Sequence, residues 1–192
     1  MRKHPEGEKT TQRLLTMAGL AEGARVLDIG AGDGETLRLL QAKGLRAEGI
    51  DRIAGRGVRR GDMKRLPWPD ASFDAVMAEC SLSVCGDTEK ALEEARRVLK
   101  PDGLLMVSDV YGKELRTAPD LSLGRPATRA GWRRIASGFR LLTWEDITPL
   151  WTEYLIHALF AGDDLGDCGF YARLRGKKTG YFLAIWKRRR RK

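Results

Sequence analysis

Short apolar runs alternate with amphipathic stretches through the first 110 residues of the chain. Four apolar runs have the length of buried strands, at residues 26–29, 47–50, 73–77 and 104–110. Three stretches among them carry apolar side chains at helical spacing, at residues 9–19, 37–42 and 87–100. Strands that alternate with helices in this way predict an α/β fold with a mostly parallel sheet.

Individual residues predict where the helices begin and end. Thr10 or Thr11 is expected to cap the first helix, and Gly19 is expected to end it. Gly44 can stop the second helix in a left-handed conformation, and Asp87 can cap the third.

The connection between the second and third strands is short. Only residues 52–57 separate the second strand from a brief third one at 58–63. A loop or a single turn is therefore expected where a helix normally joins two parallel strands. One face of the sheet should then be less covered, or covered by another segment.

The last third of the chain is richer in aromatic residues and completes the pattern. A polar connection at 111–127 is followed by predicted helices at 128–137 and 148–161 and predicted strands at 138–145 and 181–186. Seven strands are thus expected, within one domain of 192 residues.

A glycine-rich turn, residues 30–34, joins the first strand to the second helix. Its glycines are spaced G-x-G-x-G, whereas the dinucleotide fingerprint is G-x-G-x-x-G. Asp28, Asp33 and Glu35 crowd this turn; they would repel a pyrophosphate and would accept a ligand that carries an ammonium and a sulfonium. A strand, turn and helix without any ligand is the simpler alternative.

Polar residues follow the carboxyl ends of the predicted strands, at 28–34, 51, 62 and 79–85. Ligands of open α/β sheets bind in a crevice beyond those ends. These positions are therefore expected to converge on one site.

Three motifs resemble class I S-adenosylmethionine (SAM)-dependent methyltransferases. Residues 28–34 resemble the first motif, D-x-G-x-G-x-G, and residues 66–74 are similar to the family segment L-P-F-x-D-x-S-F-D. Residues 97–105 are similar to R-V-L-K-P-x-G-x-L, with Asp102 in place of a common second glycine. The resemblance is to the methyltransferase type 11 group, which includes the ubiquinone and menaquinone methylases. It implies a Rossmann-like, doubly wound, mostly parallel seven-stranded sheet with an antiparallel last strand at or near its edge.

The resemblance also implies a cofactor, SAM, and roles for residues around it. Asp51 would hold the ribose hydroxyls, Asp28 would face the ammonium, Asp62 would bind the adenine amino group and Met63 would pack on the ring. The expected cofactor-binding residues are Asp28, Gly30, Ala31, Gly32, Asp51, Arg52, Gly61, Asp62, Met63, Glu79 and Cys80.

The methyl acceptor implied by the resemblance is a small molecule, attacked in line without a covalent enzyme intermediate. Candidate bases on the acceptor side are Tyr154, His157, Cys85 and Tyr111. The alternative for each is a side chain that packs in the core without a catalytic role. Cys80, Cys85 and Cys168 allow a further hypothesis, a thiolate-lined site for a soft metalloid acceptor. Because the sequence has only two histidines and no C-x-x-C pair, a structural zinc site is not expected.

Charge and composition add alternatives. The net charge is +9, of which residues 187–192 supply six positive charges, so the high isoelectric point is largely a property of this basic tail. We expect a cytoplasmic protein without a membrane span or signal peptide. The expected parts are an N-terminal helical cap (1–24), a cofactor core (25–110), an acceptor-side part (111–186) and the tail. RNA or DNA methylation that uses the tail, and SAM binding without catalysis, are the competing functions.

Overall fold

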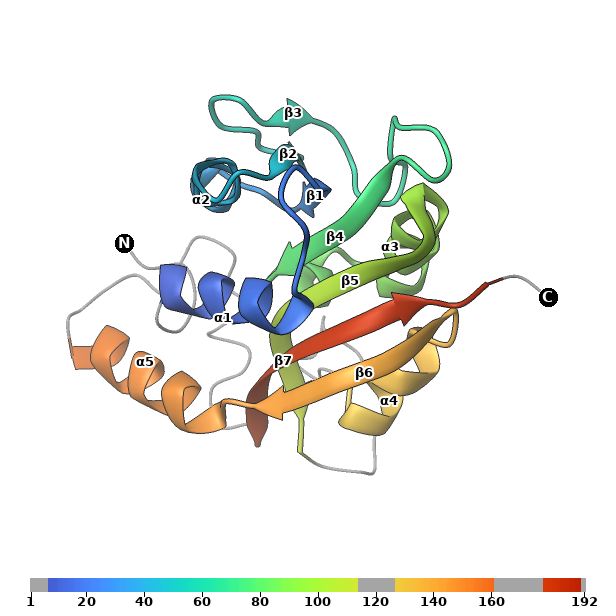
Figure 1. The fold of residues 1–192 in the computed structure, drawn as a ribbon. Coiled ribbons are helices and arrows are strands. Elements are labelled where there is room, and N and C mark those ends of the chain that lie inside the picture. Colours follow the sequence, from blue (N-terminus) through green and yellow to red (C-terminus); the bar gives the residue numbers. More distant parts are fainter. Residues whose placement is uncertain (1–6, 114–126, 161–177, 191–192) are drawn as a thin grey trace.

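The computed structural model describes residues 7–113, 127–160 and 178–190, without the side chains of 158–160. One seven-stranded sheet, in the order β3-β2-β1-β4-β5-β7-β6, runs through the molecule (Figure 1). Its strands are β1 Arg25–Ile29, β2 Arg46–Asp51, β3 Arg59–Arg60, β4 Phe73–Glu79, β5 Leu99–Gly112, β6 Phe139–Asp146 and β7 Thr179–Arg188. The helices are α1 Glu8–Ala18, α2 Glu35–Ala42, α3 Thr88–Val98, α4 Arg129–Ile135 and α5 Thr148–Phe160, with a short 3-10 helix η1 at Leu82–Val84.

The sheet topology confirms the fold class. Strands β1 to β5 pair in parallel, whereas β7 pairs antiparallel with both β5 and β6. The last strand therefore lies one position in from the edge, and β6 is the edge strand.

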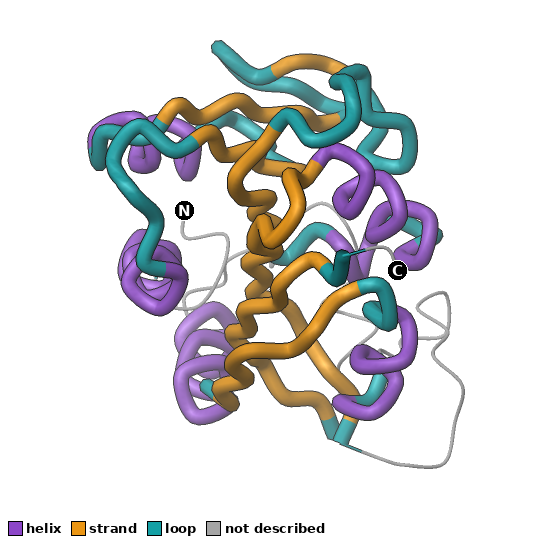
Figure 2. The backbone as a smooth tube through the Cα atoms, turned by 45° about the vertical axis from the view of Figure 1, so that its right-hand side comes forward, coloured by secondary structure: helices purple, strands orange, loops and turns teal. Residues whose placement is uncertain are grey.

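Helices lie on both faces of the sheet (Figure 2), and an apolar cluster holds them on each face. On one face α1, α2 and α5 contribute buried Leu14, Leu40 and Trp151. On the other face α3 and α4 contribute Leu92 and Trp132, which pack in one cluster with residues of β1, β4 and β7. Within the described segments, no helix combines the length and apolar character that a membrane span requires.

The predicted N-caps of the first helix are wrong. Gly7 is the N-cap of α1, and Thr10 and Thr11 lie buried within its first turn. Their hydroxyls were expected to bind free backbone amides, but the Thr11 hydroxyl donates to a carboxylate 68 residues away in sequence. Gly19 does end the helix with a left-handed conformation, at φ 58°.

The predicted cap of α3 and the predicted stop after α2 are confirmed, whereas α3 ends at Val98 and β5 begins at Leu99, earlier than the predicted 100 and 104. Asp87 caps α3 by accepting a hydrogen bond from the backbone amide of Lys90, at 3.0 Å. Gly44 adopts φ 77° just past the end of α2.

The short connection after β2 is confirmed as a loop, although β3 contains two residues instead of the predicted six. This loop folds back onto the glycine-rich turn: the amide of Gly55 donates to the carbonyl of Gly32, at 2.8 Å. A Cβ atom at Gly55 would lie 2.4 Å from Cα of Asp33, so the two backbones touch. The loop thus occupies the space beside the turn that a helix would otherwise border.

The last strand is longer than predicted and includes part of the basic tail. β7 extends through Lys187 and Arg188. Lys187 and Arg190 both form ion pairs with Asp102, which occupies a left-handed position (φ 64°) in the early part of β5. The tail as far as Arg190 is therefore bound to the domain by specific contacts.

Candidate functional site

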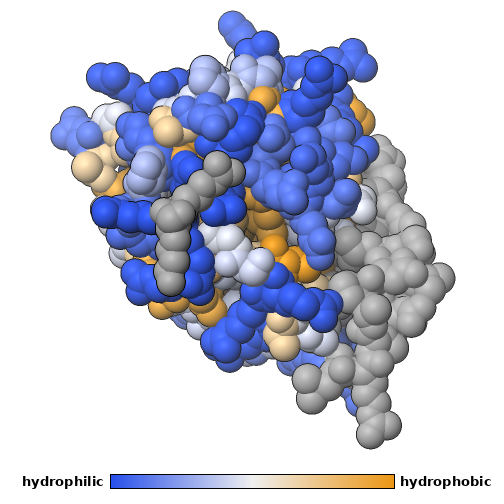
Figure 3. Space-filling view, turned by 90° about the vertical axis from the view of Figure 1, so that its right-hand side faces the viewer, coloured by the Kyte–Doolittle hydropathy of each residue, from blue (hydrophilic) through white to orange (hydrophobic). Residues whose placement is uncertain are grey.

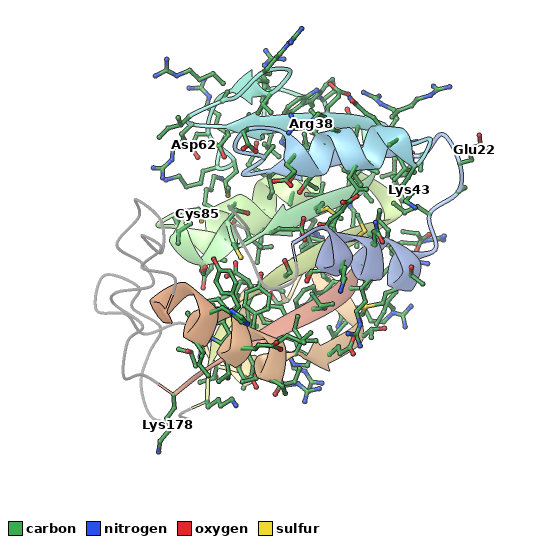
Figure 4. The ribbon with its side chains drawn as sticks, turned by 90° about the vertical axis from the view of Figure 1, so that its left-hand side faces the viewer. Glu22, Arg38, Lys43, Asp62, Cys85 and Lys178 are labelled. Carbon is green, nitrogen blue, oxygen red and sulfur yellow. The ribbon has the colours of Figure 1, made fainter. Side chains whose placement is uncertain are left out.

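A cavity of about 740 Å³ opens beside the carboxyl ends of β1 and β4, between the first turns of α1 and α2. This volume is typical of small-molecule sites. Figure 4 shows Asp62 and Cys85 toward this end of the molecule and Glu22 and Lys43 at the other. Six of the expected cofactor residues line the cavity: Asp28, Gly30, Ala31, Gly32, Glu79 and Cys80.

Gly30 is required by the protein itself. It adopts φ 88°, and a Cβ atom there would lie 2.3 Å from Cβ of Ser81. Ser81 follows β4, and its hydroxyl donates to the carbonyl of Ile29 at 2.8 Å. The glycine therefore lets the segment after β4 close onto the end of β1, beside the cavity that Gly30 and Cys80 line.

Asp51 holds the glycine-rich turn in place. One carboxylate oxygen accepts from the amide of Gly32 at 2.9 Å, and the other accepts from the amide of Ile53 at 2.8 Å. Each oxygen retains another lone pair for an external donor. Ile53 is 87% exposed, an exposed large apolar side chain beside the site that the sequence analysis missed.

Glu79 is the centre of a hydroxyl cluster that sequence reasoning also missed. Its carboxylate accepts from Thr11 of α1 at 2.9 Å, from Thr36 of α2 at 3.1 Å and from Ser108 of β5 at 3.3 Å. Three elements far apart in sequence therefore meet at one carboxylate, and no local pattern reveals such a meeting.

Asp28 is buried in the cavity wall, at 2% exposure. Burial, and then the charges of Glu79 and Asp51, raise its pKa well above the ordinary value of 3.8. A bound cation would relieve this repulsion and favour the ionised carboxylate. The cluster of three carboxylates is thus suited to a positively charged ligand group.

The other five expected cofactor residues are not among the residues that line the cavity: Asp51, Arg52, Gly61, Asp62 and Met63. Asp62 accepts from the amide of Lys64 at 2.9 Å, and the amide of Gly61 donates to the carbonyl of Asp51 at 2.9 Å. The methyl carbon of Met63 lies 3.3 Å from the place of a Cβ atom on Gly30, so this side chain borders the turn. Arg52 is exposed.

Cys80 has a strained backbone at the end of β4. Its φ is 49°, a value that non-glycine residues seldom adopt. Its thiol lies 2.8 Å from the hydroxyl of Tyr181, which in turn donates to Ser108 at 3.3 Å. Trp151 of α5 stacks on the Tyr181 ring at 5.2 Å. The aromatic residues of α5 and β7 thereby reach the cavity through Cys80.

Asp109 of β5, a residue outside the predicted site, anchors the segment after β4. Its buried carboxylate accepts from the amides of Ser83 and Val110 at 2.9 and 2.8 Å. Burial raises its pKa to about 6. Asp109 thus holds η1 against β5.

The four candidate bases lie in different surroundings, and none is among the residues that line the cavity. Tyr154 is half-buried and stacks on Trp151 at 5.9 Å, while His157 is exposed. Tyr111 is buried and donates to Asp146 at 2.5 Å; burial, and then this hydrogen bond, raise its pKa. The buried Cys85 thiol donates to the carbonyl of Leu82 at 3.1 Å, and burial raises its pKa. Cys168, the third member of the metalloid hypothesis, lies outside the described residues.

Comparison with known proteins places the chain in a family. A family profile described as "Methyltransferase domain" matches residues 27–107. An uncharacterized protein of Haemophilus influenzae is 32% identical over 170 residues, which is 72% of this chain and 67% of that protein. The 27-O-demethylrifamycin SV methyltransferase of Amycolatopsis mediterranei is 36% identical over 120 residues, 53% of this chain and 44% of that enzyme. The chain spans about half the length of most of the curated methyltransferases that it matches.

A solved structure supports the same fold. Geranyl diphosphate C-methyltransferase of Streptomyces coelicolor, in complex with Mg²⁺, a substrate analogue and S-adenosylhomocysteine, superposes with a TM-score of 0.74 over 95% of this chain and 76% of that one, at 18% identity. The glycine-rich turn and the acidic ends of β1 and β2 lie within the residues that the profile matches. The chain therefore belongs to the class I SAM-dependent methyltransferases.

Proposed function

We propose that this protein transfers the methyl group of SAM to a small-molecule acceptor by in-line displacement. The observation that carries the proposal is the cavity of about 740 Å³ beside the glycine-rich turn, with the buried Asp28 and the half-buried Glu79 in its wall. SAM carries an ammonium and a sulfonium, and carboxylates excluded from water stabilise such cations more strongly than exposed ones do.

Each part of the cofactor has a suitable partner on this chain. The ammonium would lie against Asp28, and the ribose hydroxyls would donate to the free lone pairs of Asp51. Ile53 and Met63 offer apolar surfaces for the two sides of the adenine ring, and Asp62 offers an acceptor for its amino group. The methyl group would then point past Cys80 toward the side of α5 and β7.

The chain's chemical contribution would be to position the reactants and exclude water. In-line transfer from a sulfonium needs the acceptor atom held opposite the methyl group, with its proton taken by a base or by solvent. The rifamycin methyltransferase among the relatives acts, by its name, on a small molecule. We assign an acceptor of that size class to this protein, with residues 111–186 as the acceptor-side part and the cytoplasm as its location.

The nucleic-acid alternative has less support. In the described part of the tail, Lys187 and Arg190 pair with Asp102, and the Nε atom of Arg189 donates to the carbonyl of Phe139 at 2.9 Å. SAM binding without catalysis differs from the proposal only in turnover.

Calorimetric titration with S-adenosylhomocysteine, with NAD as the comparison ligand, tests the cofactor site. We expect micromolar binding of the first ligand alone. Glu79→Gln should weaken it about 10- to 100-fold, because a charged acceptor of three hydroxyls is lost, whereas Glu22→Gln at the opposite end should leave it unchanged. A preference for NAD, or equal behaviour of the two variants, would contradict the assignment.

Turnover separates the enzyme from a binding protein. A panel of hydroxylated, amino and quinol small molecules is incubated with SAM carrying an isotopic label in its methyl group, and label in the product is counted. Transfer to a member of the panel supports the proposal. Transfer to RNA alone would favour the nucleic-acid alternative.

A further inference from the structure

A second cavity, of about 630 Å³, opens at the opposite edge of the sheet, where the parallel strands begin. It lies between α3, α4 and the chain after β7, away from the glycine-rich turn. Figure 3 views this side of the molecule and shows apolar residues exposed between hydrophilic ones. The apolar part of the wall comes from Leu92, Ile135 and Phe139.

The charged part of the wall is dominated by four arginines, Arg96, Arg134, Arg189 and Arg190. Arg190 is already paired with Asp102. The two carboxylates of the wall are Glu89 and Glu93, and Glu93 is paired with Lys90 at 3.0 Å. Three guanidinium groups therefore face the cavity against one carboxylate that has no such partner among the described residues.

Arg96 carries a buried hydrogen-bond donor that is not satisfied within the part of the chain that the structure describes. Its Nε atom is buried and has no hydrogen-bond partner among the described residues. A buried donor left without a partner costs about 1–3 kcal/mol. The side chain crosses over Gly138, where a Cβ atom would lie 2.8 Å from its Cδ atom, so the glycine admits the arginine at this place. An anion in the cavity would satisfy the donor.

Arg189 is positioned by two contacts with the backbone, whereas Arg134 is exposed. The amide of Arg189 donates to the carbonyl of Gly138 at 3.1 Å, and its Nε donates to the carbonyl of Phe139 at 2.9 Å. These bonds fix the chain after β7 at the mouth of the cavity. Arg134, at the end of α4, is exposed and has no ion pair within the described part of the chain.

We infer that this second cavity is a binding site for a small molecule bearing a phosphate or diphosphate group. Guanidinium groups match phosphate oxygens through paired N–H donors, and three of them around one space favour a multiply charged anion. The volume of about 630 Å³ and the apolar part of the wall fit a small ligand with an organic part. The site is separate from the methyl-transfer cavity and does not depend on its assignment.

Inorganic pyrophosphate is the probe for this site. It is titrated calorimetrically into the full chain saturated with S-adenosylhomocysteine, so that the glycine-rich turn is occupied. If the nucleoside does not bind, the same titration is performed with Asp28→Asn in addition, to show that the signal does not come from the first cavity. We expect saturable binding that weakens at least about tenfold in Arg134→Gln.

Arg133→Gln is the matched control, because Arg133 is equally exposed on the same turn of α4 but is not among the residues that line the cavity. It should bind pyrophosphate as the unchanged protein does. Arg96→Gln should also lose binding, with the fold checked by circular dichroism. The inference is overturned if pyrophosphate does not bind at 10 mM, a concentration on the order of the weakest specific affinities. It is overturned equally if Arg134→Gln and Arg133→Gln behave alike, or if a single-stranded RNA binds through these arginines while pyrophosphate does not.

Discussion

Replacing Gly30 by alanine should disrupt the site through a single added carbon atom. The new Cβ would lie 2.3 Å from Cβ and 2.9 Å from the hydroxyl oxygen of Ser81. The backbone at Gly30 also has φ 88°, where an L side chain is strained by about 1–2 kcal/mol. Overpacking adds about 1–3 kcal/mol. We therefore expect the free energy of unfolding to fall by about 2–5 kcal/mol.

Gly57→Ala separates the two contributions. Gly57 has a similar φ of 81°, but a Cβ atom there would meet nothing within 4 Å. Its cost should be the backbone part alone, about 1–2 kcal/mol. Urea denaturation followed by tryptophan fluorescence measures both variants, provided that the dependence of the unfolding free energy on urea is unchanged.

A second substitution tests the contact directly. Ser81→Gly removes the atoms that the new methyl group meets, so it should restore part of the stability when combined with Gly30→Ala. Equal costs for Gly30→Ala and Gly57→Ala, together with no rescue by Ser81→Gly, would refute the close approach of the segment after β4 to the glycine-rich turn.

Three further predictions concern the buried carboxyl groups of Asp28 and Asp109 and the hydrogen bonds of Arg97. Affinity for S-adenosylhomocysteine should rise with pH, and binding should release a proton. The reason is that burial and two neighbouring carboxylates raise the pKa of Asp28, whereas the ammonium of the ligand favours its ionised form. Calorimetry in two buffers of different ionisation enthalpy measures the proton release. Burial raises the pKa of Asp109 from 3.8 to about 6, so this group should cost the folded state about 3 kcal/mol as the pH rises from about 3 to about 7. Denaturation of Asp109→Asn over the same range should show a smaller loss. Arg97 donates to two backbone carbonyls of the 66–70 segment, so Arg97→Lys should lower the unfolding free energy by about 1–3 kcal/mol in urea.

Each of these has an outcome that contradicts it. Proton release that persists in Asp28→Asn would place the titration elsewhere. An unchanged pH slope in Asp109→Asn would mean that its carboxyl group stays ionised throughout that range. Full stability in Arg97→Lys, with Lys90→Gln as the exposed control on the same helix, would show that the hydrogen bonds from Arg97 to the 66–70 segment do not stabilise the fold.

Most of the fold could be predicted from the sequence, because each central strand of the sheet is a short apolar run followed by a polar turn. The run at 26–29, the glycines after it and the carboxylate of Asp51 all act locally or at one strand's distance, so spacing alone predicts their place. Met63 and Asp62 follow a strand in the same way, although that strand is only two residues long because it pairs with just two residues of β2.

The rest could not be read from spacing. Thr11 looks like a helix cap in sequence, but its hydroxyl binds Glu79 across the fold. The contacts of the basic tail could not be predicted either, because Asp102 in the β5 segment supplies a partner for two of its residues. Both cases concern polar groups whose partners lie more than 60 residues away, where sequence periodicity carries no signal.

The two outer strands differ in how well they resist pairing with another molecule. β3 presents only Arg59 and Arg60, a short and positively charged border that repels a second copy of itself. β6 is eight residues long, and the irregularity between Leu141 and Thr143 interrupts its regular pairing with β7. Leu142, 43% exposed at this irregularity, is therefore the point where the β6 border combines an apolar side chain with a broken ladder. Self-association by strand addition, and the aggregation that follows from it, would begin at β6 and would be hindered by that irregularity.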